Sequence, residues 1–464
     1  MEQRLALDMS LLRRYDVSGP RYTSYPTALQ FSPAVGVDSY LGAVAAGNED
    51  FVPRPLSLYV HIPFCRKVCF YCGCNKVITA NYRRAESYLA RLQAEIQRQG
   101  RLFAGDRGLQ QLHFGGGTPT YLKDDDLVSL LGSINAAFSA VKGPQREFSI
   151  EIDPRTTDAG RMRLLSQLGF NRMSLGVQDF DPEVQKAVNR EQSVEQTREV
   201  IDAGREAGFR STNLDLIYGL PLQSVDSFAA TLETVLEMRP ERLAVYNYAH
   251  MPHLFKVQRQ IRASDLPGPE QKLAILEMTI RRLLDAGYVY IGMDHFALPD
   301  DELARAQREG GLHRNFQGYS TRAECDLIGV GASAISKIGD AYFQNHKDLD
   351  DYQAAIDAGG FAVTRGAVLS AEDVLRRDVI MALMCHSQVR FGDIERRHKV
   401  VFRQYFAGEL ERLKGFIEDG LLEIRADGIY VTPRGRLLLR NIGMVFDAYA
   451  APDRARQGRF SKVI

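Results

Sequence analysis

The sequence predicts an α/β fold built on a partial (β/α)6 barrel of the TIM type, and three observations support this prediction. Apolar, strand-like runs alternate with helical patterns through the middle of the chain, which predicts a parallel sheet with helices outside it. Six such strands are too few to close the usual eight-stranded barrel. Chemically distinctive residues follow the strands, so we expect an open barrel that carries its reactive groups on one rim.

The length of 464 residues indicates two to three domains. We divide the chain into an N-terminal arm or lid (1–54), the partial barrel with an extension (55–365) and a C-terminal cap (366–464). The cap is expected to be mostly helical. Its pattern of helix, strand, turn, strand and helix is that of a winged-helix-like domain.

The elements of the barrel follow one another without a break. The six predicted strands cover residues 56–62, 109–114, 147–152, 172–177, 212–217 and 242–248. The predicted helices lie near 83–99, 124–139, 159–168, 193–207, 224–238 and 269–287. Beyond them we expect one more strand at 288–297, a charged linker at 300–311 and a glycine-rich run at 329–335.

Composition and charge exclude several classes of protein. The chain is 45% hydrophobic and 25% charged, and 58 basic and 58 acidic residues give a formal net charge of zero. A general binder of nucleic acids or membrane surfaces is expected to carry a basic excess, so we expect neither partner and interpret the winged-helix-like part as a structural cap. No apolar run approaches the ~20 residues of a membrane span, and the N-terminus lacks the apolar core of a signal peptide. We therefore expect a cytoplasmic protein.

The arm contains Arg21 and Tyr22 within a run, 15–27, that also holds a glycine and two prolines. These glycine and proline residues are incompatible with a long helix. The arginine and the tyrosines fit two interpretations equally well. The segment is either an arm packed on the domain surface or a lid over a site that faces carboxylates.

The cysteine loop after the first strand is the most informative motif. Cys65, Cys69 and Cys72 are separated by three and then two residues. A loop of this length can wrap three thiolates around one face of a 4Fe–4S cluster and leave the fourth iron open. The alternative is a structural zinc site that also uses Cys74, but zinc sites often pair two C-x₂-C knuckles, and the sequence has no second knuckle. Tyr71 is placed to lay its ring on a bound adenine.

Further candidates follow the later strands. A glycine run at 115–117 allows close approach of the backbone to a ligand. Glu151 and Asp215 are natural acceptors for ribose hydroxyls or an ammonium group, and Arg190 can clamp a carboxylate. Each of these charges alone could equally be a solvated rim residue.

The cysteine spacing resembles that of the radical S-adenosylmethionine (SAM) enzymes. Within them, the chain is similar over nearly its whole length to the oxygen-independent coproporphyrinogen III oxidases, also called coproporphyrinogen dehydrogenases. The segments that carry this resemblance are 19–27, the cysteine loop with Cys74, 115–120, 176–180, 188–191, 213–221, 313–319 and 459–464.

The resemblance implies a set of cofactor sites. Cys65, Cys69 and Cys72 would bind the 4Fe–4S cluster. The family binds two molecules of SAM. Tyr59, Gly116, Glu151 and Ile335 would line the first site, and Tyr71, Gly117, Thr118, Gln178, Arg190, Asp215 and Ala249 would line the second. Further catalytic residues are not identified.

The resemblance also implies the reaction. A deoxyadenosyl radical takes a β-hydrogen from a propionate side chain of coproporphyrinogen III, and loss of CO₂ and one electron leaves a vinyl group. Two propionates are converted, giving protoporphyrinogen IX. Because the substrate has four carboxylates, Arg21 and Tyr22 are candidate substrate contacts. A one-electron donor such as flavodoxin or ferredoxin is required, and we expect a monomer.

A haem-binding chaperone with a related barrel and cluster is the main rival interpretation. Such proteins lack the long arm and the extra Cys-x-Cys, and they carry a His-Asn-x-x-Tyr-Trp stretch. This chain has the arm, has Cys74 and contains no tryptophan. The sequence therefore favours the oxidase.

Overall fold

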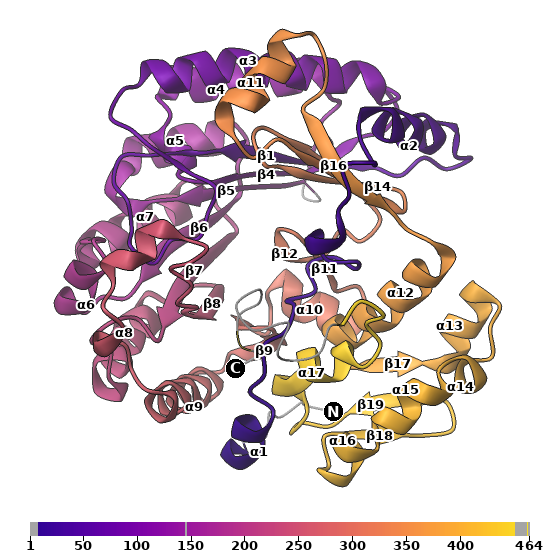
Figure 1. Cartoon of the computed structure of the whole chain (residues 1–464). Coiled ribbons are helices and arrows are strands. Elements are labelled where there is room, and N and C mark those ends of the chain that lie inside the picture. The colour runs from indigo at the N-terminus through magenta and orange to yellow at the C-terminus, as the bar shows by residue number, and fades with distance from the viewer. Residues whose placement is uncertain (1–7, 144–145, 451–461, 463–464) are drawn as a thin grey trace.

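The computed structural model describes residues 8–143, 146–450 and 462. Its main sheet has twelve strands in the order β16-β15-β14-β13-β1-β4-β5-β6-β7-β8-β10-β9. Helices flank the outer face of this sheet, the C-terminal part lies beside its last strands, and the N-terminal segment runs between the two (Figure 1).

The centre of the sheet consists of the predicted parallel strands, which pair in sequence order. They are β1 (Leu56–Ile62), β4 (Leu109–Gly116), β5 (Glu147–Ile152), β6 (Arg172–Gln178), β7 (Ser211–Tyr218) and β8 (Arg242–Asn247). The sheet ends at β16 on one side and β9 on the other. Among the described strands it is therefore open rather than a closed eight-stranded barrel.

The crossover helices lie within a few residues of their predicted positions. They are α3 (Arg83–Leu102), α4 (Asp124–Ala137), α5 (Ala159–Gln167), α7 (Val194–Glu206), α8 (Val225–Met238) and α9 (Pro269–Asp285). The short helix α6 (Pro182–Ala187), which precedes α7, was not predicted. The helix α3 buries Tyr88, Leu92 and Ile96 at intervals of four residues, so one stripe faces the sheet. Capping boxes at Ser193 and Ser224 fix where α7 and α8 begin.

The single strand expected at 288–297 is wrong, because the chain forms a hairpin there. Strand β9 (Val289–Gly292) and strand β10 (His295–Ala297) pair antiparallel, and β10 also pairs with β8. Met293 and Asp294 between them both have positive φ, 43° and 76°. Two consecutive left-handed residues reverse the chain, and the continuous apolar run concealed this turn.

The linker expected at 300–311 is also wrong, because it contains helix α10 (Glu302–Glu309). Asp301 caps the helix by accepting from the Leu303 amide at 2.8 Å, and it pairs with Arg242 of β8 at 2.9 Å. Asp301 and Glu302 of this segment are therefore bound to the arginines of the sheet, while its later charges are exposed.

The sheet has further strands that the sequence did not reveal. They are β13 (Asp326–Val330), β14 (Ile335–Ile338), β15 (Ala341–Asn345) and β16 (Val363–Val368), with helix α11 (Leu349–Asp357) before the last of them. Strand β13 pairs parallel with β1, so seven parallel strands stand side by side instead of six. The glycine-rich run is the end of β13 and its turn. A side chain at Gly329 would lie 2.6 Å from the Ile335 carbonyl oxygen, which explains the glycine.

Short strand pairs complete the barrel part. Strands β2 (Phe64–Cys65) and β3 (Val77–Ile78) pair parallel at the cysteine loop. Strands β11 (His313–Asn315) and β12 (Gly318–Ser320) form a hairpin.

The C-terminal part is mostly helical. It contains α12 (Ala371–His386), β17 (Gln388–Arg390), α13 (Phe391–His398), α14 (Phe402–Tyr405), α15 (Ala407–Arg412), α16 (Lys414–Glu418), β18 (Leu422–Ile424), β19 (Gly428–Val431) and α17 (Leu439–Met444). Its strands form a small sheet in the order β17-β19-β18. Its core includes Leu383, Phe402 and Ile442 and extends to Ile291 of β9, so it is packed against the edge of the main sheet.

The N-terminal segment contains α1 (Met9–Arg14) and α2 (Val37–Glu49). Tyr22 and Tyr25 between them are buried in the C-terminal core. Figure 1 shows this segment crossing between the barrel and the C-terminal part. Of the helices in the described ranges, none has the length and apolar character needed to cross a bilayer.

Candidate functional site

The cysteine loop lies at the carboxyl end of β1, as predicted. Its two ends are joined where the Val77 amide donates to the Pro63 carbonyl oxygen at 2.7 Å. Its middle is held by the Asn189 side chain, which donates to the Val68 carbonyl oxygen at 2.8 Å. These two contacts fix the backbone of the loop that carries the three thiols of the motif.

Donor groups from neighbouring strands point at the thiols. The Thr118 hydroxyl donates to Cys65 Sγ at 3.4 Å, and Arg190 Nη1 donates to Cys69 Sγ at 3.6 Å. Gly117 lies so close that a side chain there would meet the Pro63 carbonyl oxygen at 2.5 Å and Cys65 Sγ at 3.0 Å. This surrounding of hydrogen-bond donors and close backbone suits sulfurs that carry negative charge.

The donor set fits an iron–sulfur cluster. Cys69 is buried, Cys65 and Cys72 are half-buried, and Cys74 is exposed. Among the described residues, no three His, Cys, Asp or Glu side chains converge closely enough to hold one metal ion. A cubane places each thiolate on a different iron atom, which suits three cysteines on one loop whose sulfurs accept hydrogen bonds from Thr118 and Arg190.

The Cys74 thiol forms a hydrogen bond with Cys72. A hydrogen bond from the Cys74 thiol and the nearby Lys76 ammonium lower the pKa of Cys72 to about 6, although burial opposes this. Burial raises the pKa of Cys65 to about 11. Cys74 thus has a defined contact, which the sequence could not assign.

The interior of the open barrel is polar because polar residues alternate with apolar ones along its strands. Leu112 and Phe114 of β4 point into the hydrophobic core, while Gln111 and His113 line an interior cavity of about 190 Å³. The same alternation supplies the other inward residues, Glu147, Ser149, Glu151, Arg172, Ser174, Ser211, Asn213, Asp215, Arg242 and Tyr246. A cavity this polar can bind a hydrophilic ligand.

Glu151 is the acceptor in a network beside the cysteine loop. It accepts from the Gly116 amide at 3.0 Å and lies 3.3 Å from His113 Nε2. Although burial raises the pKa of Glu151, the His113 and Gly116 contacts hold it below its ordinary value. The Tyr59 hydroxyl lies 3.1 Å from His61 Nδ1, and the Tyr59 ring stacks on His113. The structure therefore brings together three residues of the first predicted SAM site.

Asp215 lies further round the interior. Ser174 Oγ and Asn213 Nδ2 donate to its carboxylate at 3.0 and 2.9 Å. Burial, reinforced by the charge of Glu151, raises the pKa of Asp215 to about 6. Ionising this carboxylate in the folded protein therefore costs free energy. A cation or a hydroxyl group of a bound ligand would lower that cost.

Arg190 links the loop to two strands. Its Nη2 donates to the Gly176 carbonyl oxygen at 2.5 Å, and its Nη1 lies 3.4 Å from Asp153. Asp153 is also bound by Arg155 at 2.7 Å. Gln178 ends the same strand as Gly176, with a φ of 70°. These predicted residues therefore share one rim with Cys69.

The remaining cofactor candidates, Ile335, Ala249 and Tyr71, lie elsewhere on the rim. Gly329 pairs with Tyr59 across β1 and β13 and packs against Ile335, so Ile335 stands one strand away from Tyr59. Ala249 follows β8 and lines a separate cavity of about 370 Å³. Tyr71 packs in a small cluster that includes Tyr248.

The two substrate candidates of the arm have different surroundings. The Tyr22 side chain is buried, and its hydroxyl donates to Asp447 at 3.0 Å. Arg21 instead pairs with Asp294 of the β9–β10 turn at 2.5 Å, and its guanidinium lies 5.6 Å from the centre of the Tyr246 ring. Only Arg21 thus faces a cavity.

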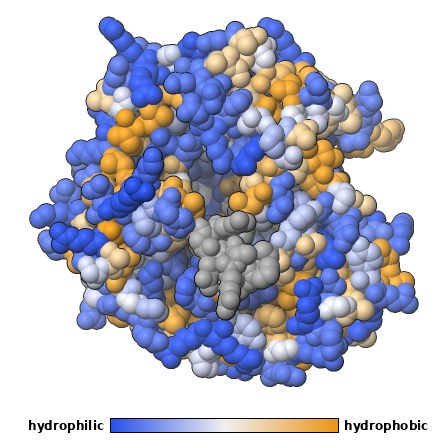
Figure 2. Space-filling view, viewed as in Figure 1, coloured by the Kyte–Doolittle hydropathy of each residue, from blue (hydrophilic) through white to orange (hydrophobic). Residues whose placement is uncertain are grey.

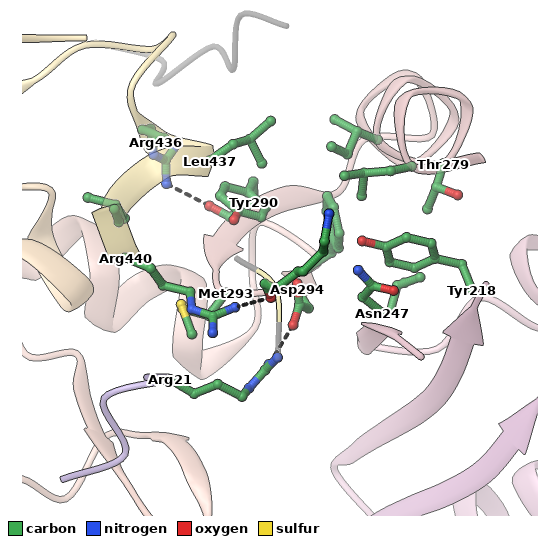
Figure 3. Close-up of a pocket in the computed structure, with 16 residues that line it drawn as sticks. Arg21, Tyr218, Asn247, Thr279, Tyr290, Met293, Asp294, Arg436, Leu437 and Arg440 are labelled. Atoms are coloured by element: carbon green, nitrogen blue, oxygen red, sulfur yellow. Dashed lines mark hydrogen bonds and ion pairs between the residues drawn. The ribbon is translucent and has the colours of Figure 1, made fainter. Parts of the chain in front are cut away.

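We call the cavity beside Arg21 the arginine pocket. Its charged lining is Arg21, Asp294, Arg436, Arg440 and Lys462, contributed by the arm, the β9–β10 turn, the segment at α17 and the C-terminal end (Figure 3). It shares Tyr218, Asn247, Leu276 and Lys462 with the cavity at Ala249, so the two are neighbours. Figure 2 shows the face hollowed at its centre, between the barrel and the C-terminal part.

Several residues of these cavities were missed from the sequence. His113, Ser174, Asn213 and Tyr246 could have been found, since each occupies the polar position of an alternating strand. Asp294 and Arg440 carried no such signal, because a turn and a distant helix bring them together.

Comparisons with known proteins agree with this geometry. The chain matches the Radical SAM superfamily over residues 59–235 and the HemN C-terminal domain over residues 369–438. It is 52% identical to the oxygen-independent coproporphyrinogen III oxidase of Pseudomonas aeruginosa over 98% of each chain. It is 51% identical to that of Escherichia coli, over 100% of this chain and 99% of the relative. A solved structure described as coproporphyrinogen III oxidase (HemN) from Escherichia coli, a radical SAM enzyme, matches with a TM-score of 0.92 at 50% identity, covering 97% of this chain and 100% of that chain.

The open barrel, the three thiols on its rim and the superfamily match define a radical SAM enzyme. This class implies a 4Fe–4S cluster and SAM as the groups that the site holds. Relatives at about half identity over the full length narrow the assignment further. The chain belongs to the family of oxygen-independent coproporphyrinogen III oxidases.

Proposed function

We propose that the chain catalyses the oxidative decarboxylation of two propionate side chains of coproporphyrinogen III, giving the vinyl groups of protoporphyrinogen IX in haem biosynthesis. The observation that carries the proposal is the cysteine loop with its hydrogen-bond donors on a polar rim, in a chain similar over its full length to enzymes of that name. Each conversion removes one β-hydrogen, one CO₂ and one further electron from the substrate.

We assign the cluster to Cys65, Cys69 and Cys72. The chemistry that the cluster and SAM supply when bound is reductive cleavage of the sulfonium to a carbon radical able to abstract that hydrogen. The Thr118 hydroxyl and the Arg190 guanidinium would stabilise the thiolates by donating to their sulfurs. The closely packed Gly117 backbone leaves no room for a side chain beside Cys65.

We further propose two SAM sites with the residues predicted from the sequence. The network of Tyr59, Gly116, Glu151 and Ile335 supports the first. Its acceptor, Glu151, is held ionised by His113 and the Gly116 amide and could bind an ammonium or ribose hydroxyls. For the second, Gln178 and Arg190 lie on the rim near Thr118, Gly117 and Tyr71, with Asp215 inside the barrel and Ala249 beyond β8.

The N-terminal arm and the C-terminal part have proposed roles of their own. We propose that residues 1–54 form a lid over the substrate and that residues 366–464 form a winged-helix-like cap. The order α16, β18, β19, α17 supports the cap, and the position of Arg21 on the lining of the arginine pocket supports the lid. A flavodoxin- or ferredoxin-type electron donor, a monomeric state and a cytoplasmic location remain predictions.

Anaerobic reconstitution tests the function. The holoenzyme with a reductant, SAM and coproporphyrinogen III should release deoxyadenosine and form vinyl product, in amounts that fall to background in a Cys65→Ala variant. Tight haem binding without vinyl product or deoxyadenosine would contradict the proposal and favour a haem chaperone.

A further inference from the structure

The arginine pocket carries more positive than negative charge. Its described lining contains four cationic side chains and one carboxylate, Asp294. Lys462 is paired with Asp16 at 2.5 Å. Arg436 donates to the Tyr290 carbonyl oxygen at 2.7 Å, and Arg440 donates to the carbonyl oxygens of Pro20 and Lys462. Arg21 is the lining cation that pairs with Asp294. Burial and the charges of Arg21 and Arg314 lower the pKa of Arg440 to about 9, as expected where cations lie close together.

The contact between Arg21 and Asp294 differs from a buried structural ion pair. Their side chains are 32% and 23% exposed, whereas Arg107 and Asp326 elsewhere in the chain are 0% and 2% exposed. Neither partner of the first pair lies within a helix or strand, since Arg21 belongs to an irregular part of the arm and Asp294 to the β9–β10 turn. A pair that is open to solvent and lines a cavity can exchange partners.

The pocket also has the right neighbours for a large substrate. It adjoins the cavity of about 370 Å³ that contains Ala249, whose lining includes the apolar residues Met251, Leu266 and Leu273. Arg21 lies against Tyr246, which belongs to the polar interior. An apolar wall for pyrrole rings therefore stands next to cations for carboxylates.

Resting on the proposed function, we infer that Arg21 binds a carboxylate of the porphyrinogen that is not the reacting one, and that Asp294 is an internal substitute for this carboxylate. Before the substrate arrives, Asp294 holds Arg21 in place. The substrate carboxylate then takes over the guanidinium, and Asp294 is left in the field of the remaining arginines. The pocket would in this way select substrates by their number of carboxylates.

The inference predicts opposite effects of two conservative substitutions. Arg21→Gln removes a charge-assisted contact and should weaken binding of coproporphyrin III, the stable oxidised form of the substrate, by about tenfold or more. Asp294→Asn removes the competing carboxylate and should tighten binding several-fold. Asparagine also tolerates the left-handed backbone of this turn. The control is Arg14→Gln, an arm residue that pairs with Asp419 on the surface, and it should leave binding unchanged.

The measurement is equilibrium titration of the reconstituted holoenzyme, followed by porphyrin absorbance, with thermal melting to show that each variant is folded. The tetramethyl ester of coproporphyrin III has no carboxylate and should bind all four proteins equally weakly. If both variants weaken binding in the same direction, or if their difference persists with the ester, the pair is structural and the inference is wrong. Vinyl formation by the wild-type enzyme is scored separately, so failure of the proposed function is distinguishable from failure of the pocket assignment.

Discussion

At the scale of single residues, Asp215 combines a proposed role in SAM binding with a cost in stability. Its pKa is raised from 3.8 to about 6 in the folded protein by burial and by Glu151. The folded state therefore retains a proton that the unfolded state releases between about pH 4 and 6. Stability is highest below this window and falls as the pH rises through it.

We expect Asp215→Asn to stabilise the protein, because it removes a carboxylate that is costly to ionise. The gain in free energy of unfolding should be about 3 kcal/mol at pH 8 and about half as large at pH 5. Urea denaturation of the apo-protein at the two pH values measures it. A gain in stability that is the same at both pH values would contradict the titration of Asp215. Weaker SAM binding by the variant would indicate that the carboxylate takes part in binding SAM.

Thr118 makes a second residue-scale contact whose effect is electronic. Its hydroxyl donates to Cys65 Sγ at 3.4 Å, and such bonds to cluster ligands raise reduction potentials by stabilising the reduced state. We expect Thr118→Val to shift the cluster to a more negative midpoint potential in a redox titration followed by electron paramagnetic resonance. Thr234→Val, on the exposed side of α8, is the matched control and should leave the potential unchanged.

At the scale of elements, the junction of β4 with the cysteine loop requires a residue without a side chain at Gly117. A Cβ at Gly117 would lie 2.5 Å from the Pro63 carbonyl oxygen and 3.0 Å from Cys65 Sγ. We expect Gly117→Ala to displace the loop and lower the iron and sulfide content of the reconstituted protein at least several-fold.

The control for this substitution is Gly132→Ala. Gly132 lies inside α4 with nothing near its Cβ position, so alanine there should stabilise the helix by up to about 1 kcal/mol and leave the iron content unchanged. Normal iron content in Gly117→Ala would show that the loop adapts and that the tight packing is not required.

The elements also show what could be predicted from the sequence. The six parallel strands β1, β4, β5, β6, β7 and β8 and the longer helices between them were found because apolar periodicity and length are local properties. The cysteine motif could be recognised because one loop carries it, and its assignment as the cluster ligands stays a prediction. The β9–β10 reversal was missed because Met293 is not a typical left-handed residue and lies in an otherwise apolar run. Strand β13 was missed because its glycines read as a loop, although its pairing with β1 shelters them.

At the scale of the whole molecule, the arm is part of the C-terminal core. Tyr22 and Tyr25 are fully buried there, next to residues of α12 and α17. No sequence pattern could show this contact, since about 350 residues separate the partners along the chain and only the tertiary fold joins them. The arginine pocket escaped prediction for the same reason.

We expect Tyr22→Ala to destabilise the protein by about 3–5 kcal/mol, the usual cost of deleting a large buried aromatic side chain. Hydrogen exchange should become faster in α12 and α17, while α4 on the far side of the sheet should be less affected. Tyr22→Phe separates the packing role from a substrate contact. If that variant is stable but binds coproporphyrin III more weakly, Tyr22 contacts the substrate as the sequence suggested.

The pairing of β1 with β13 has a consequence for synthesis of the chain. Leu56 lies opposite Asp326, and Val60 lies opposite Val330. Because β13 is synthesised about 270 residues after β1, one edge of β1 has no partner strand until then. At ordinary translation rates this is an interval of roughly 15–50 s. Throughout it the nascent barrel exposes an unpaired strand edge beside three reduced thiols, a template for misassociation. The ribosome-bound chain is therefore the form most in need of a chaperone, and premature termination before residue 326 should yield aggregates rather than a truncated enzyme.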